Sequence, residues 1–156
     1  DNYIGIMIES LRRKKDVLTD ILKLSEEQSL LLDDPNLEPD TFEKNVNRKA
    51  ALIDKLEQLD TGFESLYDKV KEELESNRDI HKEQIRQMQE LIRALTELNM
   101  QIQATEARNK EKATAKFAYI RQQAKEIRSS QKIVKEYYNN MMHKAYNEPH
   151  FLDNKK

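Results

Sequence analysis

The chain has 156 residues, about one domain's worth, of which 37% are hydrophobic and 36% charged, with a net charge of −2. This balance favours long amphipathic helices over a compact globule with a thick core. There are no cysteines, which excludes disulfides and thiolate metal sites and fits a reducing cytosol.

The longest apolar cluster near the start, residues 4–8, has five residues and includes Gly5. It is too short for a membrane span, and nothing resembles a signal peptide. We therefore predict one helical domain over residues 1–156, located in the cytoplasm and without stable membrane insertion.

The small net charge hides an asymmetry along the chain. Residues 1–109 carry 16 Lys and Arg against 24 Asp and Glu, whereas residues 110–156 carry 11 against 5. An acidic body is thus joined to a basic arm. The arm also holds six of the ten aromatic residues, namely Phe117, Tyr119, Tyr137, Tyr138, Tyr146 and Phe151.

Two helices are predicted in the first half of the chain. Apolar residues at helical spacing indicate a helix over about 3–32, and the prolines at 35 and 39 mark the loop that follows. A second helix is predicted over about 41–75. Gly62 interrupts it, and we interpret this glycine as a kink or close approach inside one helix, since it costs only about 1 kcal/mol there.

A third helix is predicted over about 79–145, after a break at residues 76–79, because residues 79–145 contain no Gly or Pro. At 1.5 Å per residue it would be roughly 100 Å long, and about half of it would be left uncovered. The alternative is a break near residues 109–112 that folds the arm back as a fourth helix. Residues 146–156 are predicted to be a non-helical tail.

These elements predict an all-α fold. We expect an elongated antiparallel three-helix bundle or coiled coil with a very long third helix, whose C-terminal half extends from the bundle. Its apolar residues form two stripes that are one residue out of register. The polar run 103–116 separates the stripes and is interpreted as the boundary between scaffold and site.

Features of a catalytic or cofactor site are missing from the sequence. No His or Glu stands four residues from His81, and two isolated glycines cannot form a phosphate loop. We predict no enzyme, no metal site and no cofactor. The basic arm suggests nucleic-acid binding as a hypothesis. Glutamates at 111, 126, 136 and 148 are interspersed among its basic residues, so we predict no nucleic-acid partner.

The second stripe predicts a partner surface in the uncovered arm. Aromatic, aliphatic and Met residues at helical spacing can receive an amphipathic helix in a groove. The predicted client-binding residues are Phe117, Ile120, Ala124, Ile127, Val134, Tyr138 and Met141. The same spacing is also typical of a homodimer interface or of the core of a fourth helix, and these readings stay open.

Three segments resemble FlgN-type flagellar export chaperones of Gram-positive, clostridia-like bacteria. They are 59–63 (Leu-Asp-Thr-Gly-Phe) with 66–70, 102–109 (Ile-Gln-Ala-Thr-Glu-Ala-Arg-Asn) and 137–141 (Tyr-Tyr-Asn-Asn-Met). The resemblance in pattern extends from the first helix to Met141.

The resemblance implies a cytoplasmic chaperone that binds the amphipathic C-terminal helix of hook-associated proteins. It also implies that the chaperone prevents premature assembly and delivers its clients to the export gate. In some members a tyrosine near the C-terminal end contacts the export gate, and Tyr137 or Tyr138 is the nearest candidate for that tyrosine here. The alternatives are a structural coiled-coil protein that dimerises, and the related chaperone of the filament cap protein.

Overall fold

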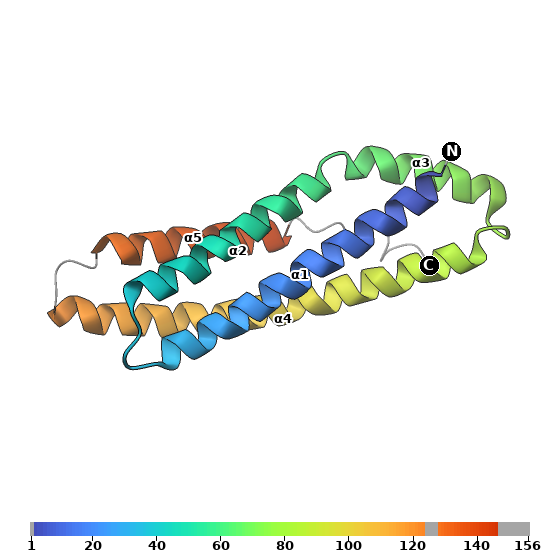
Figure 1. The fold of residues 1–156 in the computed structure, drawn as a ribbon. Coiled ribbons are helices and arrows are strands. Elements are labelled where there is room, and N and C mark those ends of the chain that lie inside the picture. Colours follow the sequence, from blue (N-terminus) through green and yellow to red (C-terminus); the bar gives the residue numbers. More distant parts are fainter. Residues whose placement is uncertain (1, 124–127, 147–156) are drawn as a thin grey trace.

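The computed structural model describes residues 2–123 and 128–146, and these residues form an all-α bundle, as predicted. Figure 1 shows the helices packed side by side along one long axis. The helices are α1 (Tyr3–Asp33), α2 (Pro39–Asp60), α3 (Phe63–Asn77), α4 (Lys82–Gln123) and α5 (Arg128–Tyr146).

The chain runs up and down this axis. In Figure 1, α1 and α4 run in one direction, and α2, α3 and α5 run in the other. α1 lies in the middle of the packing, since it contacts α2, α3 and α4. The loop after α1 is where the sequence predicts it, whereas the break between α3 and α4 lies at residues 78–81, two residues beyond the predicted break at 76–79.

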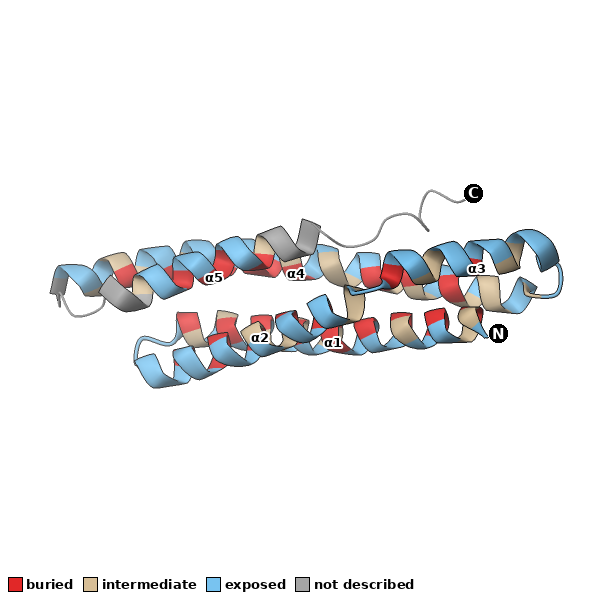
Figure 2. Cartoon of the chain, turned by 90° about the horizontal axis from the view of Figure 1, so that it is seen from above, coloured by how far each residue is buried: buried red, intermediate tan, exposed pale blue. Residues whose placement is uncertain are grey.

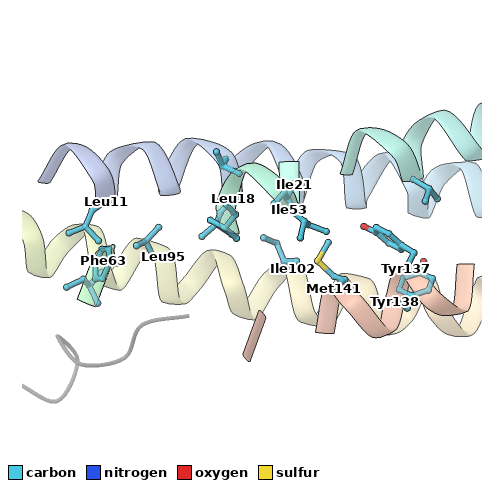
Figure 3. Packing of buried hydrophobic residues seen from close by; sticks show 14 of the residues in the cluster. Leu11, Leu18, Ile21, Ile53, Phe63, Leu95, Ile102, Tyr137, Tyr138 and Met141 are labelled. Atoms are coloured by element: carbon cyan, nitrogen blue, oxygen red, sulfur yellow. The ribbon is translucent and has the colours of Figure 1, made fainter. Parts of the chain in front are cut away.

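The buried residues lie on the sides of the helices that face one another along the bundle, as the colours of Figure 2 show. Each helix contributes one stripe, as amphipathic helices do when they share a core. Figure 3 shows Leu11, Leu18 and Ile21 of α1 opposite Leu95 and Ile102 of α4. The core is therefore continuous from one end of the bundle to the other.

The prediction of one helix over 41–75 is wrong, because the chain turns at Thr61 and Gly62. Gly62 has a φ of 78°, which is the left-handed region, and α3 begins directly after it. An L-residue pays a steric penalty in this conformation and glycine does not. The glycine thus ends one helix and starts another.

Lys14 of α1 holds the two sides of this turn. Its side chain is buried, and its Nζ lies 2.6 Å from Oδ1 of Asp60, the last residue of α2. The same Nζ lies 4.9 Å from the ring centre of Phe63, the first residue of α3. The junction is therefore anchored from a third helix by an ion pair and a cation–π contact.

The prediction of a very long third helix that extends from the bundle is also wrong. α4 ends at Gln123, and α5 runs back along the bundle and packs against α4 and α2. Burial of a large apolar side chain stabilises the folded state by about 1.5–3 kcal/mol. An extended arm would lose this stabilisation for every apolar residue of its stripe. Folding back is the stable solution.

The reversal lies beyond the position that the alternative proposed. α4 is continuous through residues 109–112, and the chain reverses between Gln123 and Arg128. The predicted tail, apart from Tyr146 at the end of α5, lies outside the described residues.

Candidate partner-binding site

Most of the predicted client-binding stripe is part of the core that α4 and α5 share with α1 and α2. Phe117, Val134, Tyr138 and Met141 are buried, and Ile120 is half-buried. The ring centre of Phe117 lies 5.4 Å from that of Phe42 in α2, in an edge-to-face arrangement. The spacing left open whether these residues form the core of a helix that folds back, and this is the arrangement that the structure shows. The side chains of Ala124 and Ile127 lie outside the described residues.

The two tyrosines predicted to contact the export gate lie inside the bundle. Tyr138 is 1% exposed and Tyr137 is 7% exposed, and Figure 3 shows both rings between α5 and the helices opposite it. The Tyr138 hydroxyl donates to Oε1 of Gln28 in α1, at 2.7 Å. Burial, and secondarily the charge of Glu106, raises the pKa of both tyrosines above the usual value.

A central polar cluster lies where α1, α2, α4 and α5 meet. It comprises Ser25, Gln28, Lys49, Glu106, Asn109 and Tyr138, all of them buried. Lys49 Nζ lies 2.5 Å from Glu106 Oε1 and donates to Gln28 Oε1 at 3.0 Å. The Ser25 hydroxyl also donates to Glu106 Oε1. A buried charge is tolerated only when it is paired in this way.

Gln28 Oε1 is the acceptor that ties the four helices together. It accepts from Lys49 of α2, from Tyr138 of α5 and, at 3.3 Å, from Asn109 of α4. Asn109 also donates to the backbone oxygen of Ser25, at 2.8 Å. The run 103–116 is therefore not a polar boundary, because its central residues lie in the core.

The sequence did contain a signal for this cluster. Lys49 falls between Val46 and Ile53, three and four residues away, and therefore occupies a seam position of the second helix. A lysine there predicts either a solvated gap or a buried partner of opposite charge. Identifying Glu106 as that partner needs the packing of α4 on α2, which spacing within one helix does not contain.

A groove lies between α4 and α5, with a volume of about 570 Å³. Its floor is apolar and includes three of the predicted client-binding residues, Phe117, Val134 and Tyr138. Charged and polar side chains line its sides; these are Lys110, Thr114 and Arg121 from α4, and Gln131, Lys132 and Lys135 from α5. We name this feature the α4–α5 groove.

A second, smaller hollow of about 120 Å³ lies between α3 and α4 at the other end of the molecule. Its apolar lining consists of Tyr67, Val70, Leu74, Ile85, Met88 and Ile92. This hollow has flanking charges of both signs, Lys71, Glu75 and Arg78. It therefore lacks the uniform charge of the α4–α5 groove.

The described residues contain no group of three or more His, Cys, Asp or Glu side chains arranged to hold a metal ion. Among the helices described above, none has the length and apolar character needed to cross a membrane.

Comparison with known proteins identifies a family. Residues 4–143 match the family model described as FlgN protein. No curated protein and no solved structure matches the chain.

Proposed function

Because the chain belongs to the FlgN family of flagellar export chaperones, we propose that it binds hook–filament junction proteins in the cytoplasm through their amphipathic C-terminal helices. In this proposal it prevents their premature assembly and delivers them to the export gate. The clostridia-like, Gram-positive origin suggested by the three motifs belongs to the same proposal.

The observation that supports this proposal most directly is the α4–α5 groove. A client helix that would polymerise exposes an apolar face, and the groove offers the apolar floor of Phe117, Val134 and Tyr138. Covering that face removes the driving force for self-assembly. At about 25 cal/mol per Å² of apolar area, a contact of modest size is enough for reversible capture.

The other predicted residues enter the proposal in different ways. Ile120 is half-buried on α4 and packs against the core, next in sequence to Arg121 of the groove, whereas Met141 is a buried core residue of α5. Ala124 and Ile127 are proposed for the end where α4 and α5 meet in sequence. A contact of Tyr137 or Tyr138 with the export gate requires α5 to move away from α1, because both rings are buried.

The proposal is tested by titrating the full chain with fluorescent peptides that cover the C-terminal helices of hook-associated proteins. Ile120→Asp and Val134→Asp are expected to weaken binding at least tenfold. Val134 is buried, so its variant can lose its fold. Thr114→Trp is therefore the sharper variant, because this exposed residue lines the groove and a large ring there would obstruct it.

Thr96→Trp is the matched control, since Thr96 is an exposed threonine on the same helix and does not line the groove. Circular dichroism confirms that each variant is folded. Binding that is unchanged by Thr114→Trp and Ile120→Asp would contradict the proposed site. Peptides from filament cap proteins, tested in the same assay, distinguish the related chaperone type by tighter binding.

A further inference from the structure

We propose that the α4–α5 groove selects acidic amphipathic helices, with carboxylates on both edges of their apolar stripe. This inference rests on the proposed function, and it names the chemistry of the segment that the groove accepts. The observation that carries it is the charge along the two sides of the groove.

Among the described residues, four cationic side chains line the groove, two on each helix. They are Lys110 and Arg121 of α4, and Lys132 and Lys135 of α5. All four are exposed, and none has a hydrogen bond or ion pair with the residues that the structure describes. Because no described residue pairs with them, we take their charges to be available to a bound molecule.

Neighbouring lysines of the same arm behave differently. Lys112 Nζ pairs with the Asp33 carboxylate at 3.0 Å, and Lys116 Nζ donates to the backbone oxygen of Asp34 at 2.6 Å. These two lysines face α1 and hold α4 against it. The described cations of the arm thus divide into those that stabilise the fold and those that face the groove.

Among the residues that the structure describes, no acidic side chain lines the groove. Glu111 and Glu136 belong to the described part of the arm and are exposed, but neither contributes to the groove lining. Positive charge on both sides of an apolar floor concentrates the field in the groove, and this favours partners of negative charge. A helix whose apolar stripe has acidic edges meets both requirements.

The spacing of the cations fits a helix. Lys110 and Arg121 are eleven residues apart on α4, which corresponds to roughly 16 Å or three turns. A partner helix of about three turns therefore reaches cations at both ends of the groove. Nucleic acid fits less well, because Phe117 and Tyr138 are buried and do not present their ring faces for base stacking.

The experiment compares two synthetic 18-residue peptides that share one leucine stripe and have Glu or Lys on its edges. Each is titrated into the full chain at low and high salt, with a fluorescent single-stranded oligonucleotide as a third probe. The test variant replaces Lys110, Arg121, Lys132 and Lys135 with Gln. The control replaces Lys23, Lys44, Arg48 and Lys82 with Gln, which are exposed, lie outside the groove and change the net charge equally.

The Glu-edged peptide is expected to bind at least tenfold more tightly than the Lys-edged peptide at low salt. The groove variant should weaken it about tenfold or more, since each exposed ion pair contributes about 1.5- to 5-fold in affinity. The control variant should change binding less than threefold. The preference should shrink at high salt, where exposed charges are screened.

Three results would overturn the inference. One is equal binding of both peptides, or preference for the Lys-edged peptide. If Thr114→Trp abolishes the binding of these peptides, the groove is still the binding site and the proposed function remains intact. Another is absence of binding by the Glu-edged peptide while peptides from hook-associated proteins bind. The third is tighter binding of the oligonucleotide, abolished by the groove variant, which would assign the groove to nucleic acid.

Discussion

Lys49 and Glu106 form a charged pair in the centre of the bundle, where burial of an apolar pair would cost less desolvation free energy. Burial lowers the pKa of Lys49, and the adjacent Glu106 opposes this shift. The pair is hydrogen-bonded to Gln28 and Ser25 of α1, so it can form only when three helices have the correct register. Buried polar groups that need exact partners favour one packing arrangement over its alternatives.

The first prediction concerns this pair. Lys49→Met leaves the Glu106 carboxylate buried and unpaired, and we expect it to lower the free energy of unfolding by about 3–5 kcal/mol. Adding Glu106→Leu should restore most of that loss, because it removes the uncompensated charge. Urea denaturation measures both. A double variant no more stable than Lys49→Met would contradict this account.

The second prediction concerns Tyr137 and Tyr138 at alkaline pH. The pKa values of both tyrosines are raised in the folded protein. The folded state therefore keeps its full stability below the ordinary tyrosine pKa of 10.0 and loses stability as the pH rises above it, because the unfolded chain then releases protons that the folded protein retains. Each tyrosine should lower the free energy of unfolding by up to about 1.4 kcal/mol per pH unit there. The lowered pKa of Lys49 acts in the opposite direction, but only below its ordinary value of 10.5.

Urea titrations between pH 10.5 and 11.5 measure this slope. Tyr137→Phe is expected to reduce this slope by the contribution of one proton, about 1.4 kcal/mol per pH unit. The substitution breaks no hydrogen bond, because the Tyr137 hydroxyl has no partner among the described residues. Tyr119→Phe is the control, since the Tyr119 ring is 63% exposed. An unchanged slope in Tyr137→Phe would refute the assignment.

At the scale of elements, the turns between helices decide the fold. The turn at Gly62 separates α2 from α3, and the reversal after Gln123 brings α5 back onto the bundle. The two breaks differ in their sequence signals. Gly62 is visible in the sequence but is easily taken for a kink, whereas the interval from Gln123 to Arg128 contains no Gly or Pro.

The third prediction tests the turn at Gly62. Gly62→Ala is expected to lower the free energy of unfolding by about 1–2 kcal/mol, because φ is positive there. No atom lies within 4 Å of an added Cβ, so the penalty comes from the backbone and not from a clash. Gly62→Asn should be milder, since asparagine tolerates this conformation better. Thermal unfolding compares the three proteins, and equal stability of Ala and Gly would refute the argument.

At the scale of the molecule, the bundle satisfies its own apolar stripes. The stripe that an extended arm would offer to a second copy is covered by α1 and α2 of the same chain. The surface that we propose for a partner is the α4–α5 groove, with apolar side chains at its floor and cations along its sides. In the proposed function, the cations of the groove serve binding, whereas Phe117, Val134 and Tyr138 belong both to the core and to the groove floor.

The fourth prediction is that the protein is a monomer at micromolar concentration. Light scattering should give a mass close to 18.5 kDa that does not change on dilution. The rival, a structural coiled-coil protein, predicts a stable dimer that loses association with Val134→Asp and ignores client peptides. A dimer of that kind would overturn both the monomer prediction and the chaperone proposal.

The amino-acid sequence by itself determined that this chain is helical, where the first helix ends and which residues of each helix are apolar. These are local properties, because spacing at 3.6 residues per turn and the loss of helix at prolines act within one segment. The family resemblance carried by segments 59–70, 102–109 and 137–141 was likewise readable there, and the FlgN family match confirmed it.

Only the tertiary structure decided which stripes meet. Phe117, Val134 and Tyr138 have the same spacing whether they face a client, a second copy or their own bundle, and the choice depends on how much apolar area each arrangement buries. The partnership of Lys49 with Glu106, 57 residues apart, has the same origin. Periodicity describes one face of one helix, whereas packing between helices is a property of the whole chain.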